Sequence, residues 1–264
     1  MLAVLGNDGN FAYVFLVILL APYIFGPLIV KLTQKSPAKP PIEVMDPDAP
    51  IPPDVEKYFA ATGNSLASAG FGLVGRMMVT DLAPGLTSFL SVMENKSVQD
   101  LALATVVLGK DMQTPKVAYI EFSNSFTDGT VVNTNNSSQS SAFARLAHKK
   151  VLQVPEELSP LALYHIHTAM LEKFGRGKAK RSEDLRDLAA FLRGSVLKEF
   201  SGQFRSGYYY VSADRQWYKP TWKGACLMTW KLCWPMKAIR ESAAKKERTE
   251  LLQSLDLAGQ SARV

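Results

Sequence analysis

The chain has 264 residues, which is more than one typical domain and less than two, and its formal net charge is +6. The charge is uneven, because residues 173–264 hold 19 Lys or Arg against 9 Asp or Glu. Such an excess indicates an anionic partner, either lipid headgroups or nucleic acid, unless it is only a solvated helical surface. The two cysteines, Cys226 and Cys233, would lie about 10 Å apart on one helix, which excludes a disulfide between them.

The first element is an uncharged run of twenty residues, 11–30. A helix of this length spans about 30 Å, the thickness of a bilayer core. A cleavable signal peptide needs a basic start and a small-residue cleavage site, and neither accompanies this run. A buried core helix is the other alternative, but uncharged runs of this length are rare in soluble folds. We therefore expect residues 1–30 to be a transmembrane anchor whose partner is the lipid bilayer.

Flanking charges predict the orientation of this anchor. No Lys or Arg precedes the run, whereas Lys31, Lys35 and Lys39 follow it closely. Basic residues favour the cytoplasmic side, so we expect the N-terminus outside and the rest of the chain in the cytoplasm. The predicted location is the cell membrane, as a single-pass protein.

Seven prolines fall within residues 31–53. Because proline fixes φ and lacks a backbone donor, this segment should be an extended linker that reaches up to about 70 Å. A ligand for a proline-recognition domain is an alternative use of the same composition. The soluble domain, residues 54–264, should begin after it with a helix that is capped by Asp54 and ends at Gly70.

Short apolar runs separated by turn residues come next, and they predict an antiparallel sheet of four to six strands. The predicted strands are residues 72–80, 86–94, 101–108, 116–126 and 131–134, with a further short strand within 149–154. The polar stretch 133–141 is expected to be an exposed loop.

Helical patterns dominate the rest of the sequence. Ser159 and Pro160 form an N-cap followed by proline at the first helical position, and Ser182 should begin the next helix. A hairpin should precede a helix that begins near Thr221 and is ended or kinked by Pro235. Strands first and helices later indicate an α+β domain, with the C-terminal helices packed on one face of the sheet.

No local pattern assigns catalytic, metal-binding or cofactor-binding residues. Gly70, Gly72 and Gly75 form a GxGxxG pattern, but a helix should precede it and a strand follow it, the reverse of a dinucleotide site. His165 and His167 would point about 200° apart on a helix, so they cannot hold one metal ion, and we expect one partly buried and one exposed histidine. We expect no cofactor. Whether the chain is an enzyme stays open, because active sites can assemble from residues that share no motif.

Residues 222–240 combine tryptophan with lysine. At 100° per residue, one apolar stripe should face the core; it comprises Ala225, Met228, Leu232, Met236 and Ile239. A second face comprises the candidate contact residues Lys223, Leu227, Trp230, Lys231, Trp234 and Lys237. Tryptophan beside lysine is typical of a headgroup interface, so this face predicts contact with anionic lipid or with a protein. The alternative is a structural role in which lysine stems cover tryptophan rings, and nucleic acid is the least favoured partner.

Three segments carry a resemblance to a known family. GRMMVTD (75–81), FTDGTVVNTNN (126–136) and TWKGACLMTWKLCWP (221–235) follow one predicted membrane span in this order. In this they resemble an uncharacterised family of bacterial single-pass membrane-anchored proteins. The resemblance covers most of residues 54–240 and implies the same architecture, with no known activity.

The sequence therefore favours a membrane-anchored binding or interaction module at the cytoplasmic membrane surface. The alternative is a hydrolase or transferase that acts on lipid-linked or envelope substrates. A deep pocket with converging polar groups would favour the enzyme, and an exposed Trp/Lys face would favour the module.

Overall fold

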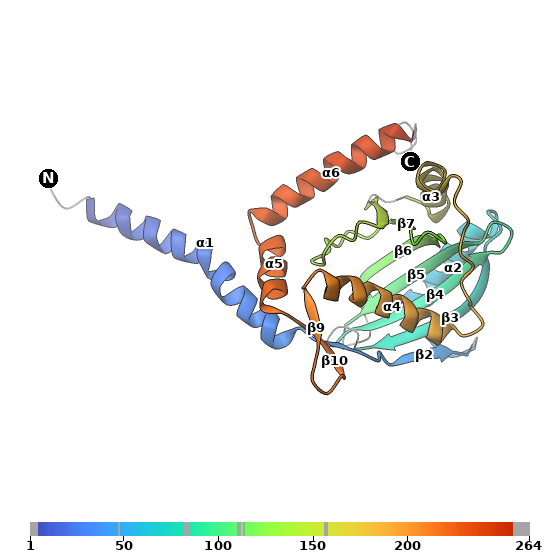
Figure 1. Cartoon of the computed structure of the whole chain (residues 1–264), viewed down its shortest axis with the longest axis horizontal. Coiled ribbons are helices and arrows are strands. Elements are labelled where there is room, and N and C mark those ends of the chain that lie inside the picture. The colour runs from blue at the N-terminus through green and yellow to red at the C-terminus, as the bar shows by residue number, and fades with distance from the viewer. Residues whose placement is uncertain are drawn as a thin grey trace.

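The protein has the predicted α+β architecture: a central seven-stranded sheet with helices against it and one long helix projecting from the body (Figure 1). The computed structural model describes residues 5–46, 48–81, 85–109, 112, 114–155 and 158–255. For residues 5–12, 15 and 16 it describes the backbone only.

Side-chain caps set where three of the described helices begin. The helices are α1 (Leu5–Thr33), α2 (Pro53–Ala67), α3 (Pro160–Gly175), α4 (Leu188–Arg205), α5 (Trp222–Leu232) and α6 (Met236–Ser254). The predicted cap of α3 is confirmed, because the Ser159 hydroxyl oxygen accepts the Ala162 N–H at 3.2 Å. The prediction that the next helix begins at Ser182 is wrong. α4 begins at Leu188 because the Asp187 side chain is the one that accepts a helix N–H, that of Ala190.

The strands form one large and one small sheet. They are β1 (Ser36–Pro37), β2 (Ile42–Met45), β3 (Gly72–Thr80), β4 (Thr87–Asn95), β5 (Asp100–Leu108), β6 (Pro115–Ser125), β7 (Val131–Asn135), β8 (Lys149–Gln153), β9 (Tyr209–Val211) and β10 (Trp217–Pro220). The large sheet has the order β2-β3-β4-β5-β6-β7-β8, and the small one has the order β1-β10-β9.

The large sheet differs from the predicted antiparallel sheet of four to six strands in two ways. It is mixed, because β8 pairs in parallel with β7. The long connection 136–148 permits the crossover that a parallel pair requires. It also gains β2 as an additional strand at one edge. The expected exposed loop at 133–141 is correct only in part, since Asn133–Asn135 belong to β7 and are buried.

The prediction that residues 31–53 form a free linker is wrong for the middle of this segment, which pairs with both sheets. Residues 36–37 pair with β10, and residues 42–45 pair with β3. Backbone pairing is available here because both segments join sheets at an edge, where proline is tolerated. We call residues 36–45 the strap, because they join α1 to both sheets.

The predicted anchor lies in α1, a single helix that extends beyond residues 11–30 at both ends. It projects from the body, and its C-terminal half lies against α5 (Figure 1). The two helices approach closely at Gly26, where an added Cβ would lie 2.5 Å from Cγ2 of Thr229. Within the part of the chain that the structure describes, none of the helices has both the length and the apolar composition that crossing a membrane requires.

Helices pack on both faces of the large sheet, not on one face as predicted. Phe89 and Met93 of β4 belong to a core with α2 and α3. Leu90 and Val92, which point the opposite way, pack with Leu188 at the start of α4. β4 is therefore apolar on both faces, and such a strand needs cover on both.

Candidate functional site

The structure divides the six candidate contact residues into an exposed and an inward group. The exposed residues are Lys223, Trp230, Trp234 and Lys237, and the inward ones are Leu227 and Lys231. Leu227 packs against the aromatic cluster beneath α5. Lys231 donates to the Phe143 carbonyl at 2.8 Å, and its Nζ lies 4.7 Å from the centre of the Tyr208 ring. These contacts favour a structural role for Lys231.

The apolar stripe predicted to face the core does so in α5 as far as Met228 and not beyond it. Ala225 and Met228 are buried. Leu232 and Ile239 are 44% and 55% exposed, so the prediction is wrong for them. The reason is that α5 ends at Leu232 and α6 is a separate helix, so one helical period does not run through both.

A tryptophan face on α5 was not predicted from the sequence. Trp222, Cys226 and Trp230 lie at i, i+4 and i+8 and are all exposed. Trp234, just beyond the helix, is 64% exposed. The spacing of Trp222, Trp230 and Trp234 in multiples of four residues already indicated one helix face. The prediction instead grouped Trp230 and Trp234 with the lysines.

Hydrogen bonds at both ends of the α1–α5 interface hold α5 antiparallel to α1. The Tyr23 hydroxyl donates to the Trp234 carbonyl at 2.7 Å. At the other end, Lys31 Nζ donates to the Pro220 carbonyl at 2.6 Å and lies 4.5 Å from the centre of the Tyr210 ring. α5 therefore lies beside the stretch of α1 between Tyr23 and Lys31, about 12 Å of helix.

The paired helices present a large apolar surface. The exposed apolar residues of α1 are between 44% and 74% accessible: Tyr13, Val14, Val17, Ile18, Leu20, Ile24, Phe25, Leu28, Ile29 and Leu32. Together with Trp222, Trp230, Leu232 and Trp234 we call them the α1–α5 surface. A soluble monomer rarely exposes an apolar area of this extent, and such areas mark contact with a membrane or a partner.

A cavity of about 490 Å³ lies between the large sheet and α4. Its apolar wall includes Leu101 and Leu103 of β5 and Leu192 of α4. Polar groups of β6 and β7, including Glu121 and Asn133, line it beside this wall. The volume and the mixture of apolar wall and few polar groups are those of a small-molecule site.

Glu121 is the most perturbed acid at the cavity. Its carboxylate accepts the Asn133 side-chain N–H at 3.1 Å and that of Asn135 at 3.4 Å. Burial raises the pKa of Glu121, and the nearby Lys149 ammonium, itself ion-paired with Glu199, only partly offsets this effect. The carboxyl is therefore easier to neutralise than an exposed one.

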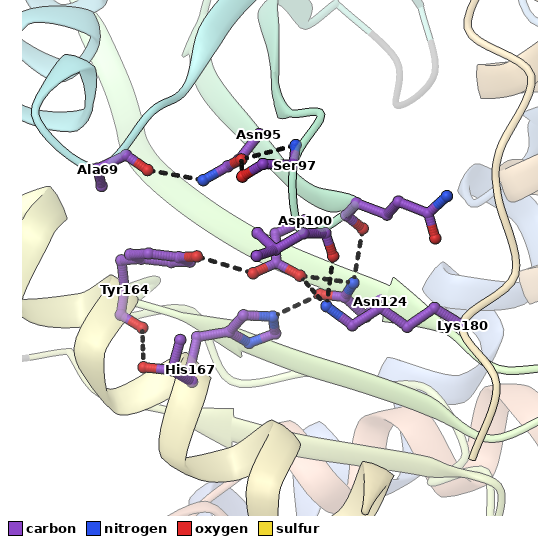
Figure 2. Close-up of polar contacts among 11 residues, drawn as sticks. Ala69, Asn95, Ser97, Asp100, Asn124, Tyr164, His167 and Lys180 are labelled. Carbon is purple, nitrogen blue, oxygen red and sulfur yellow. Dashed lines mark hydrogen bonds and ion pairs between the residues drawn. The ribbon is translucent and has the colours of Figure 1, made fainter. Parts of the chain in front are cut away.

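A buried polar network lies on the other face of the sheet, beneath α3 (Figure 2). Asn124 donates its side-chain N–H to Asp100 Oδ1 at 3.0 Å, which leaves its Oδ1 to accept from His167 Nε2 at 2.8 Å. The other ring nitrogen of His167, Nδ1, then accepts the Thr134 hydroxyl at 3.0 Å. His167 is fully buried, and burial lowers its pKa to about 3, so the ring is neutral.

Asp100 completes the network. It is 1% exposed, accepts the Tyr164 hydroxyl at 2.8 Å and pairs with Lys180. Burial, with the hydrogen bond to Asp100, raises the pKa of Tyr164. Because these groups satisfy one another and are enclosed, we assign them a structural role: they hold α3 and the segment after it on the sheet.

The expectation of one partly buried and one exposed histidine is confirmed for the exposed one, His165, whereas His167 is fully buried. Within the described part of the chain, no cluster of three or more His, Cys, Asp or Glu side chains is arranged to hold a metal ion. The glycines of the GxGxxG pattern also have structural explanations. Gly70 has φ +82° directly after the α2 region, and Gly75 gives room to Leu188, whose Cδ1 would lie 2.6 Å from an added Cβ.

No family model matches this chain, and comparison with curated proteins and with solved structures gives no match. The function is therefore argued from the α1–α5 surface and the cavity themselves.

Proposed function

We propose that this chain is a membrane-anchored interaction module, with α1 in the bilayer, α5 at the boundary between acyl chains and headgroups, and the folded domain in the cytoplasm. The observation that carries the proposal is the α1–α5 surface. Apolar area left in water costs about 25 cal/mol per Å², so burying this surface in lipid is strongly favourable. The uncharged run 11–30 includes positions whose side chains lie outside the described part of the chain, so its length is taken from the sequence.

The residues at the domain end of α1 support a headgroup location for α5. Lys31 lies 4.5 Å from the centre of the Tyr210 ring, and Lys35 lies 4.2 Å from that of Trp217. Trp222 is exposed beside this group. Aromatic rings with lysine ammonium groups are typical of the boundary between acyl chains and headgroups.

The basic C-terminal third suits anionic headgroups on the cytoplasmic side. Lys223 and Lys237 are exposed at opposite ends of the α5 region and can reach lipid phosphates. The resemblance to uncharacterised membrane-anchored bacterial proteins adds no activity to this proposal.

Fluorescence quenching by lipids brominated in their acyl chains tests the proposal on the full chain in vesicles. The chain contains four tryptophans, so variants that keep one of them and carry Phe at the others report on single sites. We expect strong quenching when only Trp230 is kept. The matched control keeps only Trp217, which is partly buried under Lys35 and should be quenched much less. Absence of quenching at Trp230 would refute the proposed location of α5.

The exposed thiol of Cys226 tests the orientation. In a Cys233→Ser background, a membrane-impermeant maleimide should label Cys226 in inside-out vesicles and leave it unlabelled in intact cells. Labelling from outside intact cells would reverse the orientation while leaving the membrane contact itself intact.

A further inference from the structure

The cavity under α4 has properties that membrane attachment does not explain. Its apolar wall includes Leu101, Leu103 and Leu192, which pack on one side against the core and stay partly exposed beside the open volume. An apolar wall around an open volume of this size is characteristic of a site that a ligand covers.

Two cationic side chains at this cavity are unpaired within the described residues. Arg181 and Arg205 line it, are exposed, and have no hydrogen-bond or ion-pair partner for their guanidinium groups in the described part of the chain. The two lysines that line it, Lys149 and Lys198, each have a carboxylate partner. Among the lining carboxylates, Glu94 and Glu121 have no ion-pair partner in the described part of the chain, and the Glu121 carboxylate accepts hydrogen bonds from two amides. The two arginines are therefore the cationic groups available to an added anion.

We propose that the cavity binds a single-chain amphipathic anion of the fatty-acid type, with the acyl chain between β5 and α4 and the anionic head at Arg181 and Arg205. The planar guanidinium group binds a carboxylate or phosphate through two parallel hydrogen bonds. A cavity of about 490 Å³ suits one chain of medium length and is too small for the two chains of a phospholipid.

Glu121 does not oppose such a ligand. Its two oxygens are occupied by the Asn133 and Asn135 amides, which spread its charge. Desolvation also raises the pKa of this partly buried carboxyl, which favours its neutral form. The polar strip on β6 and β7 is thus compatible with an acyl chain on the neighbouring leucines.

Two sources offer this ligand chemistry: free fatty acids and lysophospholipids, which carry one chain and an anionic phosphate. The inference does not depend on the proposed membrane function, because the cavity and the α1–α5 surface involve different helices. An experiment can therefore separate the two by the position that a probe labels.

The test uses the full chain in lipid nanodiscs and a dodecanoate analogue that carries a photoactivatable diazirine on its chain. After irradiation, mass spectrometry locates the labelled peptides. We expect labelling of β5 and α4 that unlabelled dodecanoate suppresses at saturation. Labelling of α1 reports contact with the bilayer alone and should resist this competition. Loss of the α1 labelling with retained β5 labelling would contradict the membrane proposal and leave the cavity proposal standing.

Variants at the rim test the anionic head. Arg181→Gln or Arg205→Gln should raise the half-maximal competing concentration of dodecanoate about tenfold, the loss expected for one hydrogen bond to a charged group. Arg193→Gln, an exposed arginine of α4 that does not line the cavity, is the matched control and should change nothing. Leu103→Trp should fill the cavity and abolish competed labelling while α1 stays labelled. Circular dichroism melting curves show that each variant is folded.

Three results would overturn the inference. The first is the absence of competed labelling in β5 and α4 of the wild type. The second is equal competition by dodecanol and dodecanoate, with no effect of either arginine change, since the site would then not recognise an anion. The third is labelling that persists unchanged in a folded Leu103→Trp variant. Competition by lysophosphatidate at lower concentration than dodecanoate would support the site and identify the lysophospholipid as its source.

Discussion

The buried histidine of α3 makes the stability of the protein depend on pH in a definite direction. Burial lowers the pKa of His167 from 6.5 to about 3. Between these values the unfolded chain binds a proton that the folded chain does not bind. The contribution of His167 to stability is therefore complete above pH 6.5 and is lost as the pH falls from 6.5 toward 3.

The size of this loss follows from the pKa difference. Each pH unit below 6.5 costs about 1.4 kcal/mol, so at about pH 5 the folded state has lost about 2 kcal/mol through this group. His167→Gln keeps a donor and an acceptor in the network and removes the titration. The difference in unfolding free energy between wild type and His167→Gln should therefore shrink by about 2 kcal/mol between about pH 7.5 and pH 5.

Urea unfolding of the full chain in detergent micelles, followed by circular dichroism at several pH values, measures this difference. His165→Gln, on the exposed side of the same helix, is the matched control and should lose as much stability as the wild type. If His167→Gln and the wild type lose the same stability over this interval, the protonation argument for His167 is refuted.

Other features of the fold give shorter tests. Gly26→Leu should separate α1 from α5, because an added Cβ would already lie 2.5 Å from Thr229 Cγ2. The unfolding free energy should fall by about 1–3 kcal/mol. An unchanged midpoint of urea unfolding would contradict the close packing of the two helices. Ser159→Ala should cost about 1 kcal/mol through the lost cap of α3, and thermal unfolding of that variant measures it. The fragment 34–264 keeps the strap and should remain folded in mild detergent, whereas the fragment 54–264 lacks β1 and β2 and should aggregate. Size-exclusion chromatography compares the two fragments. If both elute as folded monomers, the strap is not needed for folding.

Local chemistry made several elements predictable from the sequence. Residues 72–80 were predicted as a strand and form β3 with the same bounds, because a glycine-rich turn region and a run of apolar residues define them. The start of α3 was predicted from Ser159 and Pro160, whose capping roles depend only on neighbouring residues.

Non-local contacts were not predictable in the same way. Nothing in residues 42–45 shows that they will pair with β3, since their pattern is that of a short extended segment among prolines. The contact between Gly26 and Thr229 joins positions about two hundred residues apart, and each position alone is ordinary.

The candidate cavity shows the same limit. Leu103, Glu121 and Arg205 belong to β5, β6 and α4 and share no motif, so only the folded chain brings them to one volume. By contrast, the tryptophans of α5 were visible in the sequence. Their location beside α1 was not, because it depends on the course of the strap.

The strap also sets how the domain moves in relation to a bilayer that holds α1. A free linker would let the domain move up to about 70 Å from the end of α1 and rotate in any direction relative to the bilayer. With residues 36–45 fixed to both sheets, that freedom is removed, and the domain keeps two motions: drift within the plane and spin about the normal. In the proposed membrane-bound state, the end of the body that carries α3, opposite to α1 in Figure 1, would face away from the lipid. In that state a soluble partner would approach this end, and a membrane-bound partner would find the domain by diffusion in the plane of the bilayer.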